Sequence, residues 1–358
     1  MDRATVDTYE ARGPQWAANR APVRRGDAVA FGRLVAADAV RVDVGAGAGR
    51  YTAELGAPVV ALDAARTMLD LLRDAAPEAL PVQADVEALP FRRGAIGGAW
   101  SNMTHHHVPR TRLPLALADL HGALAVGAPL DLQMVHGDHE GTDLPGDDIG
   151  DRFFAAWREP MLRDVVVGAG FDIDGSVVDD DHGVVRVRAT RARTLADTVG
   201  AGMRLLVCGL NPSVYSADRG VGYARPGNRF WKTVVAAGLV APERALDPIA
   251  VLRHDGIGIT DLVKRATVAS AELSADEYRA GAARVERLVR WLEPGAVAFV
   301  GLEGWRAAID RKAIAGRQPE PFGGRPAYVL PSTSGLNAHS RLGDLVEHFR
   351  AVGALADR

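Results

Sequence analysis

The 358-residue sequence predicts an α/β protein made of two domains. A domain averages roughly 150 residues, so the length allows about two. Short apolar runs alternate with helix-like stretches in both halves, which is the pattern of sheets covered by helices. The alternation stops after Arg193 and restarts at Leu205. We therefore expect the boundary at about 195–203 and divide the chain into domains 1–198 and 199–358.

The first half contains apolar runs that predict buried strands of a mostly parallel sheet, separated by segments of helical periodicity. A Gly-Phe turn at 170–171 then leads into two alternating runs, which predict a closing hairpin. The expected strands are Val42–Val44, Val59–Leu62, Leu130–Met134 and Val184–Arg193, and the expected helices are Ala65–Asp74 and Pro114–Leu124.

The second half repeats this arrangement with a new set of buried runs. Here the longer helices carry apolar residues at three- and four-residue spacing, as helices that cover a sheet do. The expected strands are Leu205–Cys208, Ala296–Val300 and Ala327–Leu330, and the expected helices are Ala275–Leu292 and Leu342–Val352.

The composition excludes several classes of protein. With 47% hydrophobic and 24% charged residues and a mean hydropathy of −0.02, the chain is typical of a globular protein. No apolar run approaches the roughly 18 residues of a membrane span, and the first residues do not resemble a secretory or transit signal, so we expect a cytoplasmic protein. The single cysteine, Cys208, excludes an internal disulfide. The side chains of His105, His106 and His107 diverge in any regular backbone, so no metal site is expected.

The two halves carry opposite charge. Residues 1–198 hold 21 Lys and Arg against 29 Asp and Glu, a net charge of −8, whereas residues 199–358 hold 21 against 16, a net charge of +5. A basic half beside an acidic one points to a polyanionic partner for the basic half. The acidic first half is not expected to grip nucleic acid by itself.

A glycine-rich loop follows the first strand of the first half. The segment Val42–Arg50 reads VDVGAGAGR, and glycines at 45, 47 and 49 allow a sharp turn and a close approach of backbone amides to a ligand. The next strand ends in Asp63, where a carboxylate can accept hydrogen bonds from ribose hydroxyls. A third strand end carries Asp85, which can meet an adenine amino group.

These residues resemble the signature of class I S-adenosylmethionine-dependent methyltransferases over residues 20–195. The resemblance implies a Rossmann-like fold and S-adenosylmethionine as the cofactor. A nicotinamide fingerprint would need glycine where this chain has Arg50. The motifs of amino-directed and cytosine carbon-5 DNA methylation are absent, so the methyl acceptor stays open. The residues implied to bind the cofactor are Asp43, Gly45, Gly47, Gly49, Asp63 and Asp85.

Two polar loops follow strands of the second half. One reads GLNPS and contains Asn211; the other reads PSTSGLNAH and spans 331–339. Loops at neighbouring carboxyl ends of parallel strands form one cleft in open α/β sheets. Residues 199–358 resemble the mismatch-specific uracil/thymine glycosylases of the uracil-DNA glycosylase superfamily in four ordered blocks: GLNPS, the stretch from Gly220 to Trp231, GIGITDLVKRAT and STSGL. The resemblance implies an α/β/α sandwich that acts on double-stranded DNA and needs no cofactor.

Carried over residue by residue, the resemblance implies that Asn211 orients the water that attacks the deoxyribose. An amide cannot accept the proton of that water, so a slow enzyme is expected. Tyr223 would stack on an everted base and Leu336 would fill the gap left in the duplex. The base pocket would comprise Gly209, Leu210, Pro212, Tyr223, Asn228 and Ser334, and the DNA contacts would be Leu336, Gly335, Ser332, Lys264, Arg265 and Arg225, with Arg229 as a further phosphate contact.

Two hypotheses of different classes follow. The first is a glycosylase that releases uracil, or a mispaired thymine or related damaged base, fused to a methyltransferase of unknown acceptor. The alternative is a small-molecule methyltransferase whose second half binds DNA lesions without catalysis. Ser213 replaces the family's glycine after Asn-Pro, and Ala338 stands where one branch has arginine, so the preferred base is left open.

Overall fold

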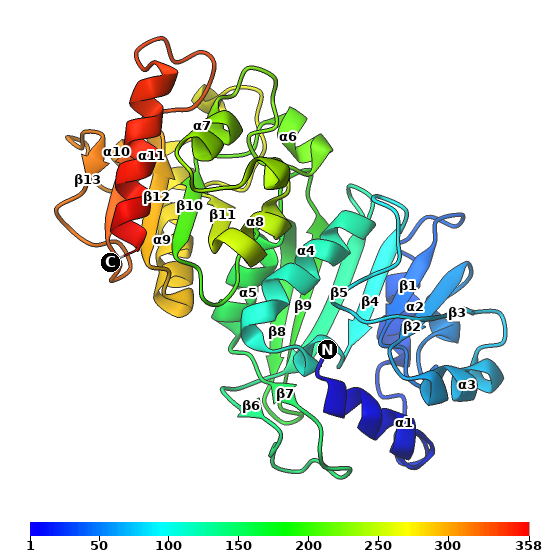
Figure 1. Cartoon of the computed structure of the whole chain (residues 1–358). Coiled ribbons are helices and arrows are strands. Elements are labelled where there is room, and N and C mark those ends of the chain that lie inside the picture. The colour runs from blue at the N-terminus through cyan, green and yellow to red at the C-terminus, as the bar shows by residue number, and fades with distance from the viewer. Residues whose placement is uncertain (358) are drawn as a thin grey trace. The chain divides into compact units, whose positions relative to one another are not determined.

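The computed structural model describes residues 1–357 and divides into two compact units. Unit 1 comprises Met1–Val167 and Phe171–Ala192, and unit 2 comprises Gly168–Gly170 and the chain from Arg193 onward. Each unit has its own sheet, and the sequence-based α/β class is confirmed (Figure 1). In the described part of the chain, no helix combines the length and the apolar character that crossing a bilayer requires.

Unit 1 is built on a seven-stranded sheet in the order β3-β2-β1-β4-β5-β9-β8. The first five strands in this order are parallel, and β9 pairs antiparallel with both β5 and β8, so the predicted closing hairpin is present. The strands are β1 Arg41–Val44, β2 Val59–Asp63, β3 Leu80–Gln83, β4 Gly98–Asn102, β5 Pro129–Val135, β8 Phe171–Asp179 and β9 Val184–Arg191, with a separate ladder of β6 Glu140–Gly141 and β7 Phe154–Ala155.

The helices of unit 1 include three that the sequence analysis did not predict, α1, α2 and α5. Helix α1 is polar on most faces and buries only Thr5 and Gly13, which explains why its pattern is weak. It lies against α3 at the edge of the sheet (Figure 1). The helices are α1 Arg3–Ala18, α2 Arg25–Gly32, α3 Arg66–Ala75, α4 Leu113–Ala123 and α5 Glu159–Gly168, with short 3₁₀ turns η1 Ala53–Leu55, η2 His105–His107 and η3 Arg110–Arg112.

Unit 2 is built on a five-stranded sheet in the order β11-β10-β12-β14-β13, parallel except for β13. The strands are β10 Leu205–Gly209, β11 Ile257–Asp261, β12 Ala296–Val300, β13 Gly316–Arg317 and β14 Ala327–Leu330. The helices are α6 Val214–Arg219, α7 Phe230–Ala236, α8 Pro248–Asp255, α9 Ala275–Leu292, α10 Leu302–Ala308 and α11 Leu342–Ala356, with 3₁₀ turns η4 Pro242–Arg244 and η5 Ser270–Glu272.

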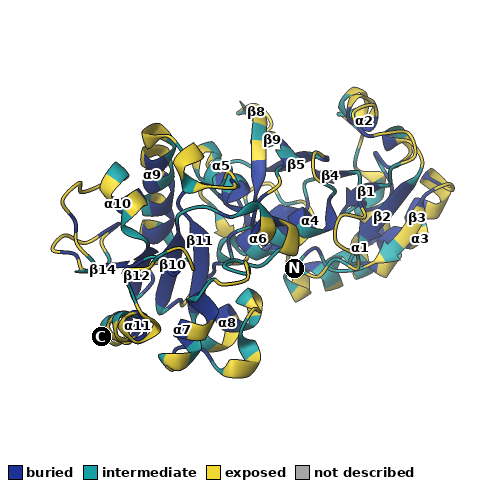
Figure 2. Cartoon of the chain, turned by 90° about the horizontal axis from the view of Figure 1, so that it is seen from above, coloured by how far each residue is buried: buried dark blue, intermediate teal, exposed yellow. Residues whose placement is uncertain are grey.

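The core of unit 2 lies between this sheet and its helices. Figure 2 shows the strands buried and the outer faces of α9 and α11 exposed. Val207 and Phe349 are fully buried in one apolar cluster, and burying a side chain of this size contributes about 1.5–3 kcal/mol. Helix α9 begins with a capping box in which Ser274 and Glu277 bond each other's backbone amides. The packed sheet fixes the strand ends from which the loops of the site emerge.

Candidate functional site

The glycine loop of unit 1 turns directly after β1. Gly45 has a φ of 69°, and a Cβ there would lie 2.1 Å from the hydroxyl oxygen of Thr104, so only glycine fits. The amide of Gly47 donates a hydrogen bond of 2.8 Å to the Asp63 carboxylate, which also accepts from the amide of Ala65. The loop and the end of β2 are thereby held together at the carboxyl edge of the sheet.

A cavity of about 670 Å³ including its open mouth, here called the unit 1 cavity, opens at this edge. Asp43, Gly45, Gly47 and Asp63 line it. Burial raises the pKa of Asp43 to about 7, although its carboxylate accepts a 2.7 Å hydrogen bond from Thr52, and burial raises the pKa of Asp63 to about 6. Two carboxyl groups with raised pKa in one cavity are typical of a ligand site.

Two residues of the implied cofactor set do not line this cavity. Asp85 instead accepts hydrogen bonds of 2.8 Å from the amino group of Met1 and one of 2.9 Å from the amide of Glu87. Gly49 faces α3 instead, since a Cβ there would approach the side chain of Leu72 at 3.0 Å. The structure thus assembles four of the six implied residues around the unit 1 cavity.

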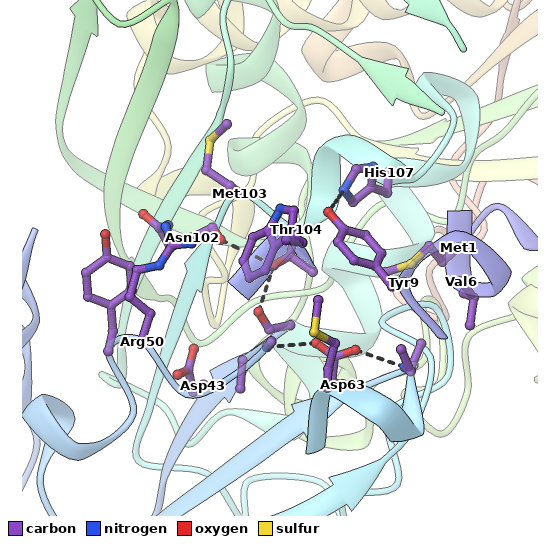
Figure 3. A pocket seen from close by; sticks show the side chains of 18 residues that line it. Met1, Val6, Tyr9, Asp43, Arg50, Asp63, Asn102, Met103, Thr104 and His107 are labelled. Atoms are coloured by element: carbon purple, nitrogen blue, oxygen red, sulfur yellow. Dashed lines mark hydrogen bonds between the residues drawn. The ribbon is translucent and has the colours of Figure 1, made fainter. Parts of the chain in front are cut away.

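Helix α1 supplies cavity residues that the sequence reasoning missed. Figure 3 shows Tyr9 beside His107, across the cavity from Arg50. Trp16 lies 4.8 Å from the Arg50 guanidinium, measured from the ring centroid, in a cation–π contact. The Nη2 atom of Arg50 is buried and has no hydrogen-bond partner in residues 1–357. A buried unpaired donor of this kind favours an anionic ligand group.

Tyr9 is fixed by a chain of hydrogen bonds. Arg152 donates to its hydroxyl oxygen at 2.7 Å, and the hydroxyl lies 3.1 Å from Nε2 of His107. Nδ1 of His107 lies 2.6 Å from the carbonyl of Phe153, which can only accept, so we assign the ring proton to Nδ1 and the Tyr9 proton to the bond with Nε2. Burial lowers the pKa of His107 to about 4, so the ring is neutral at pH 7. This series of hydrogen bonds holds α1 over the unit 1 cavity.

Unit 2 has a larger cavity, here called the unit 2 cavity, of about 1660 Å³ including its open mouth. Asn211 follows β10 and lines it. Its Nδ2 donates to Oγ1 of Thr267 at 2.8 Å and to the carbonyl of Arg265 at 2.9 Å. Within residues 1–357 its Oδ1 has no hydrogen-bond partner. The amide is therefore held through its nitrogen, and its oxygen is available to accept a hydrogen bond.

Asp261 is a functional candidate that the sequence reasoning missed, although it lies inside a matched block. It ends β11 next to β10, lines the unit 2 cavity and is 7% exposed. Burial raises its pKa to about 6, opposed by the charge of Lys264. A Cβ on Gly209 would lie 2.3 Å from Oδ1 of Asp261 and 2.8 Å from the hydroxyl of Tyr223. The glycine therefore lets the carboxyl and the phenol approach the same point.

Of the implied base-pocket residues, Leu210, Pro212, Tyr223, Asn228 and Ser334 line the unit 2 cavity, and Gly209 does not. The ring of Tyr223 stacks on Phe230 at a centroid distance of 3.9 Å, and its buried hydroxyl has no partner in the described residues. Ser213, the departure from the family glycine, caps α6 by accepting a hydrogen bond from the amide of Ser216.

The loop after β14 exposes an apolar side chain beside this cavity. Leu336 is 88% exposed and lines the mouth together with Ser332. Gly335 does not line the cavity, and a Cβ there would lie 2.8 Å from the carbonyl oxygen of Gly227. Arg229 holds the loop by donating to the carbonyl oxygens of Ser334, Asn337 and Ser340. An exposed leucine on a braced loop fits contact with another surface.

Replacing Arg229 with methionine should release this loop, since hydrogen bonds from a charged group contribute about 1.5–3 kcal/mol. We expect amide hydrogen exchange in 334–340 to accelerate more than about tenfold, while exchange in β10 is unchanged. Arg219→Met, an exposed arginine in α6, is the matched control. Equal exchange in the two variants would contradict the bracing role.

The residues implied to contact DNA phosphates differ in whether their side chains already pair with groups of the protein. Lys264 is paired with the buried Asp197 at 2.8 Å and does not line the cavity. Arg265 pairs with Glu277 at 2.7 Å on the surface. Arg229 donates its hydrogen bonds to the carbonyl oxygens of the loop after β14. Arg225 is exposed and is the one Arg or Lys among the described residues that line the unit 2 cavity. Two of these four side chains, Lys264 and Arg265, are thus neutralised by carboxylates, and Arg229 is held by backbone carbonyls.

Comparison with known families matches two separate parts of the chain. A methyltransferase domain model matches residues 42–130, and a model of the uracil DNA glycosylase superfamily matches residues 197–352. The chain therefore combines a methyltransferase domain and a uracil DNA glycosylase superfamily domain.

Solved structures similar to the chain include three methyltransferases. An S-adenosylmethionine-dependent methyltransferase from Methanosarcina mazei is 16% identical, covers 45% of this chain and 95% of its own, and has a TM-score of 0.40. One from Mesorhizobium loti is 20% identical, the match covers 45% of this chain and 96% of that one, and the TM-score is 0.37. The 1,6-didemethyltoxoflavin-N1-methyltransferase of Burkholderia thailandensis is 21% identical, the match covers 52% of this chain and 85% of that one, and the TM-score is 0.41.

Proposed function

We propose that unit 2 hydrolyses the N-glycosidic bond of uracil, or of a mispaired thymine or related damaged base, in double-stranded DNA, and that unit 1 is an S-adenosylmethionine-dependent methyltransferase. The superfamily match of unit 2 supports a DNA substrate in general. The observation that carries the glycosylase proposal is Asn211, whose Oδ1 is free beside a cavity large enough for an everted nucleotide.

The proposed hydrolysis uses two groups of unit 2. Oδ1 of Asn211 accepts a hydrogen bond from water and orients it toward the anomeric carbon. Asp261, ionised above pH 6, accepts the proton that an amide cannot take. A bond forms between the water oxygen and the sugar carbon, and the bond to the base breaks with its electron pair leaving on the base. Slow hydrolysis was expected because an amide cannot accept the proton of the water. With Asp261 as the proposed proton acceptor, that argument no longer applies.

Unit 2 also offers groups for holding the everted nucleotide. Tyr223 borders the cavity while Phe230 supports its ring, so a base can stack against it. Leu336 has the exposure needed to occupy the gap in the duplex. Arg225 is the candidate phosphate contact at the mouth.

The hydrogen-bond donors and acceptors that line the unit 1 cavity match those of S-adenosylmethionine. Asp63 is placed to accept from ribose hydroxyls, and the unpaired Nη2 of Arg50 suits the carboxylate of the amino-acid portion. When bound, this cofactor supplies an electrophilic methyl group. Tyr9, Trp16 and Met68 cover the cavity with aromatic and apolar surface and limit access of water to it.

The test of the glycosylase proposal is a panel of duplexes, each with one uracil, thymine or ethenocytosine opposite guanine or adenine, assayed for abasic sites. We expect release of uracil from a G·U pair. If the unaltered chain binds these duplexes and releases no base from any of them, unit 2 is a lesion-binding module without catalysis, and the alternative hypothesis holds.

Replacing Asp63 with alanine should lower the affinity for S-adenosylmethionine about 10- to 100-fold, because hydrogen bonds to a charged group are lost. Isothermal titration calorimetry on the full chain measures this. Asp70→Ala removes an exposed carboxylate of α3 that pairs only with surface arginines and is the control. Unchanged affinity in Asp63→Ala, or no binding by the unaltered chain, would contradict the cofactor proposal.

A further inference from the structure

Unit 1 has another cavity, here called the shelf cavity, of about 1060 Å³ including its open mouth. It lies over one face of β5, β9 and β8 and is bordered by the residues that begin α2. Met103, which directly follows β4, lines both the unit 1 cavity and the shelf cavity. Its φ is 59°, uncommon for a residue with a side chain, and its amide donates to the carbonyl of Gln133 at 2.9 Å. The two cavities therefore adjoin at one fixed residue.

Most charges around the shelf cavity neutralise one another. Arg24 donates to Asp131 at 2.9 Å and to Asp27 at 3.0 Å. Arg186 pairs with the same two carboxylates, at 2.5 Å and 2.8 Å. Arg24 also donates to Oδ1 of Asn102 at 2.9 Å, which links this network to the unit 1 cavity. Two arginines and two aspartates thus form a rigid floor without net charge.

Two polar groups of the shelf cavity are not used by the protein. Gln133 is 9% exposed, and no residue of 1–357 hydrogen-bonds to its side-chain amide. Arg188 is exposed and forms no ion pair with any described residue. The side-chain amide of Gln133 lines the cavity, so its donor and acceptor are both available to a ligand. Val177 and Val184 add apolar surface between these groups.

We propose that the shelf cavity binds the methyl acceptor, and that the acceptor is a small planar molecule with an N–H/C=O edge for Gln133 and an acidic group for Arg188. The inference rests on the proposed cofactor site of unit 1. The amide of Gln133 offers one donor and one acceptor side by side, which pairs with a lactam or imide edge. Arg188 presents a planar fork that matches a carboxylate or phosphate.

The location and charge of the shelf cavity suit this class of acceptor. Its shared wall at Met103 brings a bound molecule next to the cofactor. Methylation forms a bond from an acceptor nitrogen or oxygen to the methyl carbon, the carbon–sulfur bond breaks with its pair kept by sulfur, and the acceptor proton passes to water at the open mouth. The net charge of −8 on residues 1–198 disfavours a DNA duplex as the acceptor.

The experiment measures binding of four probes to the full chain saturated with S-adenosylhomocysteine, by ligand-observed NMR titration. The probes are 2-pyridone, 2-pyridone with a ring carboxylate, benzoate and phenol. We expect the carboxylated pyridone to bind about tenfold more tightly than 2-pyridone or benzoate, and phenol to bind weakest. Arg188→Ala should remove the advantage of the carboxylate, and Gln133→Leu the advantage of the pyridone edge. Arg33→Ala, an exposed arginine outside the cavity, is the control.

The readouts separate this inference from the cofactor proposal. If S-adenosylhomocysteine does not bind, the cofactor site itself is wrong and the inference falls with it. If it binds and all four probes bind equally or not at all, or the two variants bind them as the unaltered chain does, the acceptor assignment alone is overturned. Should Gln133→Leu fail to fold, Val177→Asp, which places a charge in the cavity, is compared with Val126→Asp at a site of similar exposure outside it. Equal probe affinities in that pair overturn the assignment.

Discussion

Replacing Asn211 with alanine should reduce single-turnover release of uracil from a G·U duplex by about 100-fold or more. The variant loses the oxygen that orients water, and misplacing a reacting group by about 1 Å already costs about 100-fold. Binding of the duplex should change little, because Asn211 is one of many residues around the unit 2 cavity. Quenched-flow assay of abasic sites and fluorescence anisotropy with the same duplex measure the two quantities.

Asn211→Asp is the matched variant for this measurement. It keeps the shape of the side chain but removes the donor to Thr267 and the carbonyl of Arg265, so a smaller loss than in the alanine variant is expected if water orientation is the main role. A rate in Asn211→Ala within a few-fold of the unaltered chain would contradict the proposed mechanism.

Replacing Asp261 with asparagine should lower the same rate by about 10²- to 10⁴-fold, the usual range for a lost general base. Because the pKa of Asp261 is raised to about 6, the rate of the unaltered chain should rise between pH 5 and 7 and then level off. The asparagine variant should show no such rise. Rates at half-unit pH intervals under single-turnover conditions test both expectations.

Glu303→Gln provides the control, since Glu303 also lines the unit 2 cavity but is exposed. Its pH profile should match that of the unaltered chain. Folding of Asp261→Asn is checked by thermal melting at pH 8. A carboxyl whose folded pKa lies above its unfolded value costs stability once pH exceeds that range, so the variant should melt no lower than the unaltered chain. A pH rise that persists in Asp261→Asn would exclude this residue as the base.

The strands and the first residues after them could be predicted because apolar runs that end in polar residues carry a strong local signal. Asp63 and Asn211 stand at such ends, Asp43 lies one residue before the end of β1, and the structure brings each of the three to a cavity. Helix α1 gave no such signal, because it buries few residues and its role depends on Tyr9 and Trp16 meeting loops far away in the chain.

Long-range pairing explains the other differences. Lys264 is bound to Asp197, 67 positions away in the chain, so its sequence neighbours cannot reveal that its charge is used. Asp261 lies inside a matched block, and its raised pKa arises from burial beside Gly209 and Tyr223 in the folded protein. Burial and partner choice are tertiary properties, and a local pattern does not contain them.

Several basic side chains near the unit 2 cavity already bond to groups of the protein, and this should weaken the binding of undamaged DNA. If Arg225 is the one phosphate contact, because Lys264, Arg265 and Arg229 are already engaged, the affinity for a duplex should fall only about three- to fourfold between 50 and 200 mM salt. Residence on undamaged DNA would then be brief. Lesions would be found by repeated short collisions, and retention would depend on capturing the everted nucleotide itself.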